Sequence, residues 1–131
     1  MVGRNPRFQI AITIVEILEK KYPNSLTYKE LEKEVNLRYK GQEPSSATLT
    51  NYLNMLSGRK TQYISFVYKG VLHRKIEENL TTRYSLTKEF KDSLDIQKGK
   101  SPTTYIQDTL SLPQFIPECD DESEESQDMV F

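Results

Sequence analysis

Residues 44–58 read PSSATLTNYLNMLSG, and the interpretation of the whole chain depends on this stretch. Pro44 disfavours helix in the residue before it, and either Ser45 or Ser46 can cap the free amides of a new helix. Gly58 follows where a left-handed residue commonly ends a helix. Between them, apolar side chains recur at helical spacing, at Leu49, Tyr52, Leu53 and Leu56. We therefore predict a helix over residues 45–57 with one buried face.

The opposite face of this predicted helix carries short polar side chains without charge, at Ser46, Thr48, Thr50, Asn51 and Asn54. A face that only meets water usually favours charged residues. Asn amides and Thr methyl groups suit the base edges of a DNA major groove, where they contact adenine and thymine. These five residues are therefore candidate DNA-binding residues. The alternative is an ordinary core helix with a polar outer face.

The charges of the chain are segregated along the sequence. The formal net charge is −1, yet residues 1–100 hold all 18 Lys and Arg residues against 11 Asp and Glu. Residues 101–131 hold 8 acidic residues and no Lys or Arg. A basic domain suits a polyanionic partner, and the acidic end needs a separate explanation.

Several classes of function are not expected. No apolar run approaches membrane length and the N-terminus lacks the apolar core of a signal peptide, so we expect a cytoplasmic protein that does not contact membranes. Cys119 is the single cysteine and His73 the single histidine, so we expect no internal disulfide, no His-based metal site and no cofactor. The sequence contains no phosphate-binding glycine loop and no nucleophile–base motif, so we expect a protein that is not an enzyme.

The segments around residues 45–57 predict a small helical core. Residues 6–22 form a helix with apolar side chains over more than half its circumference, which favours a central position. The next helix begins at Thr27, which forms a Thr-x-x-Glu capping box with Glu30. Residues 61–69 suggest a short extra helix, although their β-branched and aromatic content would also suit a strand.

A β-hairpin and a last helix are predicted after residue 70. Residues 71–76 alternate as a half-buried strand, residues 77–80 supply a turn, and residues 82–86 return as the second strand. Thr87 then caps a last helix with Phe90 and Leu94 facing inward.

The chain resembles the winged helix-turn-helix family in the order of these elements, in the pattern Ser45-x-x-Thr48-Leu49-Thr50-Asn51-x-Leu53-x-x-Leu56 and in the segment 70–74 (GVLHR). The resemblance covers residues 6–94. The resemblance is to small regulators of the archaeal, viral and plasmid type. It implies a mainly α fold with a small β-hairpin, in a domain over residues 5–98. It also implies duplex DNA as ligand, with helix 45–57 in the major groove and the wing, residues 71–86, on the phosphate backbone. The connections at 40–44 and 61–69 are longer than the family usually has.

The same resemblance suggests phosphate contacts from basic residues that follow the recognition helix or lie on the wing, namely Arg59, Lys60, Arg74, Lys75 and Arg83. The function that follows is sequence-specific binding of double-stranded DNA, as in transcription regulation. A homodimer remains one option for the assembly.

Residues 99–131 are predicted to be a disordered acidic tail, because the Ser-rich acidic run from 118 to 128 cannot bury enough apolar surface to fold. The tip, Asp128-Met129-Val130-Phe131, resembles the acidic tails by which single-stranded-DNA-binding proteins hold partner proteins. This implies a protein partner at residues 129–131. An alternative function is therefore a protein-interaction module of a replication or transcription assembly.

Overall fold

The computed structural model describes residues 6–60, 67–97, 99 and 101–115. Within these ranges the chain forms five α-helices and a three-stranded antiparallel sheet with the strand order β1-β3-β2. The elements are α1 (Pro6–Lys21), β1 (Leu26–Thr27), α2 (Tyr28–Arg38), α3 (Ser46–Leu56), β2 (Leu72–Ile76), β3 (Thr82–Leu86), α4 (Lys88–Gln97) and α5 (Pro102–Leu110). The predicted combination of a mainly helical fold with a small β-hairpin is confirmed.

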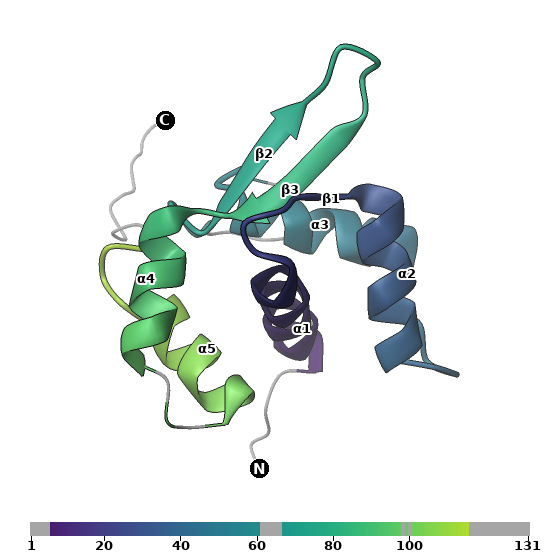
Figure 1. Ribbon diagram of the computed structural model, residues 1–131. Helices are drawn as coiled ribbons and strands as arrows, with labels where there is room; N and C mark the ends of the chain where they lie inside the picture. Colours follow the sequence, from purple (N-terminus) through teal and green to yellow (C-terminus); the bar gives the residue numbers. More distant parts are fainter. Residues whose placement is uncertain (1–5, 61–66, 98, 100, 116–131) are drawn as a thin grey trace, which may run out of the picture.

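Helix α1 is the centre of the core. It lies between α2 on one side and α4 with α5 on the other, and the β2–β3 hairpin projects away from the helices (Figure 1). It contacts α2, α3, α5 and β3. Four of its side chains are completely buried, at Ala11, Ile14, Val15 and Leu18. The predicted central position of this helix is therefore confirmed, and its wide apolar face is explained by neighbours on several sides.

The start of α2 is fixed by the predicted capping box. The Glu30 amide donates to the Thr27 hydroxyl at 3.2 Å, and the Thr27 amide donates to the Glu30 carboxylate at 2.9 Å. The amide of Thr27 holds the pKa of Glu30 below its usual value of 4.5, and the positive charges of Arg83 and Lys21 lower it further. The carboxylate form of Glu30 is thus the form that stabilises the helix start.

The sheet joins two parts of the chain that are far apart in sequence. Strand β3 pairs with β2 from Leu72–Leu86 to Ile76–Thr82, as the hairpin prediction requires. It also pairs with the two-residue strand β1, which places Leu26 opposite Tyr84. Leu26, Leu72 and Tyr84 are all buried, so one face of the sheet closes over the helices. Strand β1 was not predicted, since two residues carry no detectable periodicity.

The segment between α3 and β2 was expected to contain a short helix over residues 61–69. Residues 61–66 lie outside the described residues, and residues 67–69 are not helical. Val67 and Tyr68 are buried, and the Tyr68 amide donates to the Met55 carbonyl at 3.0 Å. Burial also raises the pKa of Tyr68. This segment therefore runs back against the C-terminal end of α3.

The predicted domain 5–98 ends too early. Ser101 caps a fifth helix by accepting a hydrogen bond from the Thr104 amide at 3.4 Å, and Pro102 occupies its first turn. Ile106 and Leu110 of α5 are fully buried, and Phe115 beyond it is only 3% exposed. The prediction that a disordered tail begins at residue 99 is therefore wrong for residues 101–115, which belong to the core. Residues 116–131 lie outside the described residues.

Polar contacts hold α5 against the two helices beside it. The Tyr105 hydroxyl donates to the Glu19 carboxylate of α1 at 2.7 Å. Lys91 of α4 lies 4.0 Å from the same carboxylate and 2.6 Å from Asp95. The Lys91 and Glu19 side chains are only 16% and 9% exposed, so these two charged groups are part of the packed interior. Together these contacts link α1, α4 and α5.

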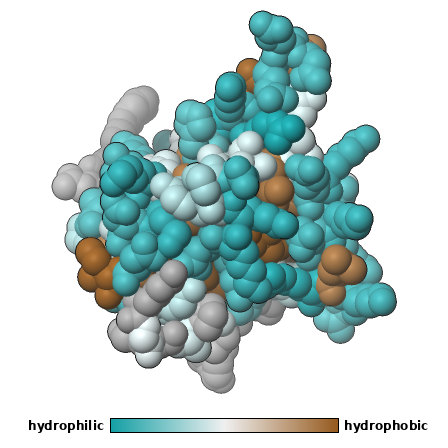
Figure 2. Space-filling view, viewed as in Figure 1, coloured by the Kyte–Doolittle hydropathy of each residue, from teal (hydrophilic) through white to brown (hydrophobic). Residues whose placement is uncertain are grey.

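Figure 2 shows a largely hydrophilic face with a few separate apolar spots. Among the described residues the exposed large apolar side chains are Leu37, Ile76, Leu80 and Ile96. Within the same part of the chain, every helix is too short or too polar to cross a membrane.

Candidate nucleic-acid interface

Helix α3 has the boundaries that the sequence predicts, to within one residue. The Thr48 amide donates to the Ser45 hydroxyl at 3.1 Å, which caps the first turn. The helix ends at Leu56, and Gly58 adopts a φ of +81°, where glycine is favoured over other residues. Its buried face consists of Leu49, Tyr52, Leu53, Met55 and Leu56. The predicted helix 45–57 with its buried face is confirmed.

The outer face of α3 carries four of the five predicted polar residues, Ser46, Thr50, Asn51 and Asn54, in one stripe. Ser46 and Thr50 are exposed, and Asn51 and Asn54 are half-buried. Residues four apart lie above one another on a helix, so Ser46, Thr50 and Asn54 follow a single line. The stripe has no charged side chain. Its donors and acceptors can therefore approach a partner without the repulsion or desolvation that a charge would bring.

Two of the predicted contact residues already have partners at the N-terminal end of α3. The Thr48 hydroxyl accepts a hydrogen bond from the Ser45 hydroxyl at 3.0 Å, so it belongs to the helix cap. The Ser46 hydroxyl points to the Glu32 carboxylate of α2, at 3.4 Å. A carboxylate at this place repels phosphate groups. The residues of the stripe best placed to contact nucleic acid are therefore Thr50, Asn51 and Asn54.

Basic side chains follow directly at the C-terminal end of α3. The Gly58 amide donates to the Met55 carbonyl at 3.2 Å, and the Arg59 amide donates to the Asn54 carbonyl at 2.8 Å. These hydrogen bonds fix the backbone that leaves the helix. Arg59 and Lys60 are exposed. The structure therefore brings these two predicted phosphate-binding residues to one end of the polar stripe.

The three predicted basic residues of the hairpin differ in their surroundings. Lys75 is exposed and takes part in no ion pair within the described ranges. Arg83 faces it across the strands, but its Nε lies 3.1 Å from the carboxylate of Glu77. Arg74 is half-buried on the other face of the hairpin, and its Nε is buried with no hydrogen-bond partner among the described residues. Lys75 is thus the best placed of the three for a phosphate contact.

The ion pair of Arg83 is weak enough for a partner to replace it. The two side chains are 34% and 36% exposed, and ion pairs at this exposure contribute about 0–1 kcal/mol. A phosphate can therefore compete with Glu77 for the guanidinium of Arg83, which presents a planar fork of donors.

The tip of the hairpin was not recognised as a site from the sequence. Ile76 is 52% exposed and Leu80 is 82% exposed, with Leu80 at a φ of +67°. The turn is fixed by the Asn79 side chain, which accepts a hydrogen bond from the Thr81 amide at 3.1 Å. With Glu78 exposed beside it, the tip is apolar and acidic. Such a tip does not suit phosphate groups.

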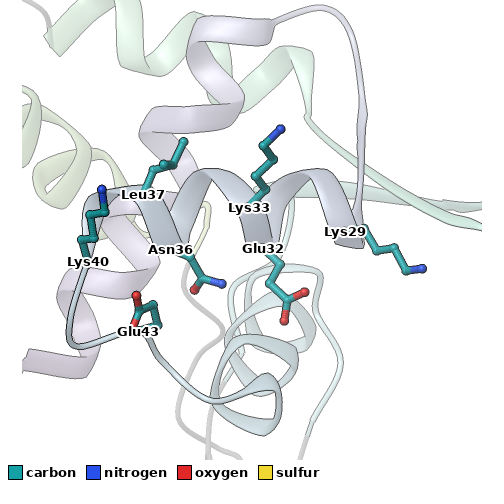
Figure 3. Close-up of a pocket in the computed structure, with 7 residues that line it drawn as sticks. All are labelled: Lys29, Glu32, Lys33, Asn36, Leu37, Lys40 and Glu43. Atoms are coloured by element: carbon teal, nitrogen blue, oxygen red, sulfur yellow. The ribbon is translucent and has the colours of Figure 1, made fainter.

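The outer surface of α2 has an open hollow of about 410 Å³. In Figure 3, Glu32, Asn36 and Glu43 point into the space between α2 and the loop to α3, whereas Lys33 and Leu37 project from the other side of the helix. The Glu43 carboxylate already accepts the Gly41 amide at 3.1 Å, and hydrogen bonds from the backbone amides of Glu43 and Gly41 lower the pKa of Glu43. The hollow has mixed charge and no converging donors, so nothing in it selects a ligand.

The described residues contain no group of three or more His, Cys, Asp and Glu side chains that could hold a metal ion. His73 is exposed on β2, on the same face of the hairpin as Lys75. A role close to the hairpin's basic side chains therefore fits His73 better than a role as a metal ligand.

Comparisons with known proteins give no relative for this chain: no family model, no curated protein and no solved structure matches it. Function is therefore inferred from the geometry of α3 and the hairpin.

Proposed function

We propose that this protein binds double-stranded DNA as a winged helix-turn-helix domain, with α3 in the major groove and the β2–β3 hairpin as the wing. The observation that carries the proposal is the uncharged polar stripe of α3, which ends at the exposed basic pair Arg59 and Lys60. Base edges in the major groove offer donors, acceptors and thymine methyl groups, which match Asn and Thr. A stripe of this kind has little use on a face that only meets water.

The division of labour within the site follows from side-chain chemistry. Thr50, Asn51 and Asn54 read base edges, since they present hydrogen-bonding groups and a methyl group without charge. Arg59, Lys60 and Lys75 contact phosphates, which positions the helix without reading sequence. Arg83 joins them when a phosphate replaces Glu77. Arg74 is not assigned a phosphate contact, because it lies half-buried on the inner face of the hairpin.

Sequence-specific binding by a small domain suits transcription regulation. The chemistry of the site requires no cofactor, because hydrogen bonds and ion pairs supply all of the recognition. The test is selection of bound duplexes from a randomised library by the full chain, followed by affinity measurements against salt. We expect one DNA sequence to be enriched. We also expect the logarithm of the binding constant to fall linearly with the logarithm of the salt concentration, with a slope of about −0.9 per phosphate contact. Recovery of random sequences with no dependence on salt would refute the proposal.

A second function, protein docking, is favoured by the hairpin tip. Ile76 and Leu80 are exposed beside Glu77 and Glu78, a combination that suits an apolar socket with a basic rim on another protein. Leu80→Asp separates the two functions: it should abolish docking through the tip and leave the selected DNA sequence unchanged. A changed DNA sequence preference in Leu80→Asp would instead place the tip on DNA.

A further inference from the structure

The acidic C-terminal stretch starts at a defined place on the molecule. Residues 116–131 contain seven Asp and Glu residues and no Lys or Arg. Phe115, to which this stretch is bonded, is 3% exposed, and its carbonyl accepts the Lys69 amide at 2.7 Å. The acidic stretch therefore begins beside the segment that joins α3 to the hairpin.

Exposed basic side chains lie near this starting point and on the adjoining hairpin. The backbone at Gly58 lies against that at Tyr68, since a Cβ at Gly58 would be 3.7 Å from the Tyr68 carbonyl oxygen. Arg59 and Lys69 each follow one of these two residues, so they lie on neighbouring segments. We call Arg59, Lys60, Lys69 and Lys75 the basic surface; all four are exposed.

We propose that residues 116–131 bind in cis to the basic surface and occupy it until DNA displaces them. The chain is long enough, because 16 residues extend at most about 55 Å whereas α3, with 11 residues, is about 16 Å long. A ligand tethered by a short linker acts at an effective concentration of about 1 mM, so weak contacts suffice. The carboxylates of residues 116–131 contact the same basic side chains that the phosphates of bound DNA would contact.

The inference extends the proposed function by naming the regulation of its site. A tethered competitor lowers the observed affinity for every duplex that must displace it. It also reduces the number of counterions that DNA binding releases, because the carboxylates have already replaced some of them. The acidic stretch should therefore weaken binding most at low salt and flatten its salt dependence.

The first test needs no DNA. In the full chain, each Asp of residues 116–131 is replaced by Asn and each Glu by Gln, and amide NMR shifts are compared with the natural chain. At about 20 mM salt we expect differences at Arg59, Lys60 and Lys69, and at about 0.5 M salt, where charges are screened over a few ångströms, we expect them to vanish. Identical spectra at low salt would overturn the inference.

A matched pair of variants tests whether the basic surface itself receives the stretch. Lys69→Gln with Lys75→Gln removes two charges from the basic surface, and Lys29→Gln with Lys33→Gln removes two from the outer face of α2 (Figure 3). Only the first pair should reduce the NMR differences between the natural chain and the chain whose residues 116–131 carry Asn and Gln in place of Asp and Glu. An equal reduction by both pairs would mean diffuse attraction to the whole domain, and the binding surface would be refuted.

DNA binding then separates this inference from the proposed function. The neutralised chain should bind a random duplex several-fold more tightly at low salt, with the gain lost as salt rises. NMR differences without DNA binding by either chain would support the cis contact and refute DNA binding. Tighter DNA binding without NMR differences would refute the cis contact and leave DNA binding intact.

Discussion

The ring of Phe115 packs edge-on against the ring of Phe90, with the centroids 4.9 Å apart and the planes at 76°. Phe90 belongs to α4 and is fully buried. Gly70, at the start of the hairpin, also lies against Phe115: a Cβ there would be 3.6 Å from the ring. Gly70 also has a φ of +76°, which disfavours any other residue. Phe115 therefore joins the C-terminal end of the described chain to α4 and to the base of the hairpin.

Replacing Phe115 with Ala should lower the free energy of unfolding by about 3–5 kcal/mol, the usual cost of removing a buried aromatic ring. Urea unfolding followed by circular dichroism measures this loss. The control is Ile96→Ala, an apolar truncation at a side chain that is 80% exposed, which should change stability by less than about 0.5 kcal/mol. Equal losses in the two variants would show that Phe115 is not part of the core.

The helix start at Thr27 supplies a second stability prediction. Thr27→Ala removes the hydroxyl that caps α2 and should cost about 0.5–2 kcal/mol. Thr50→Ala removes the same group from the outer face of α3 and should leave stability nearly unchanged, because Thr50 is exposed and caps nothing. A similar loss in both variants would contradict the role of the capping box.

The same capping box makes stability depend on pH. The pKa of Glu30 is lowered in the folded state, so its contribution is present above its usual value of 4.5 and is lost as pH falls through the lowered folded pKa. Glu30→Gln keeps a hydrogen-bond acceptor and removes the titration. The natural chain should therefore lose stability relative to Glu30→Gln as pH falls below about 4.5. A constant difference from pH 7 to pH 3 would contradict this.

Local signals were sufficient to predict the elements around these sites. The limits of α3 follow from Ser45 and Gly58, and the start of α2 follows from Thr27 and Glu30, because caps and turns depend on neighbouring residues only. The two strands of the hairpin follow from their alternation and from the short turn between them.

Elements that depend on distant partners were missed. Helix α5 has a cap at Ser101 and apolar residues at Tyr105, Ile106 and Leu110, but what makes it part of the fold is the space that α1 and α4 leave for it. The acidic composition beyond it outweighed these signals in the sequence. Strand β1 likewise exists only because β3 lies beside it.

The candidate site was predicted in its composition but not in its contacts. The polar stripe of α3 follows from helical periodicity, which is a local property. That Glu32 approaches Ser46, and that Glu77 pairs with Arg83, depends on how α2 and the hairpin turn are placed in space. These two carboxylates refine the list of candidate DNA contacts, and periodicity could not have identified them.

Base reading by α3 predicts a loss that depends on DNA sequence. Asn51→Ala or Thr50→Ala should weaken binding to the selected duplex by about 1–3 kcal/mol for each lost base contact and leave binding to a random duplex nearly unchanged. Thr27→Ala serves as the control, since it changes stability without touching the outer face of α3. Equal losses on the selected and random duplexes would show that these residues do not read bases.

The hairpin predicts effects of opposite sign for two neighbouring charges. Lys75→Gln should weaken binding to every duplex alike and flatten the log–log salt slope by about 0.9, the value for one lost phosphate contact. Glu77→Gln should strengthen binding to every duplex, because it releases the Arg83 guanidinium from the carboxylate 3.1 Å away and removes a charge that repels phosphate. Fluorescence anisotropy with a labelled random duplex at several salt concentrations measures both effects.

A control in the Arg83→Gln background tests the role of this ion pair. There Glu77→Gln can act only by removing repulsion, so its gain in affinity should be smaller than in the natural chain. An equal gain in both backgrounds would mean that Arg83 does not reach the DNA, and an unchanged salt slope in Lys75→Gln would remove the hairpin from the interface.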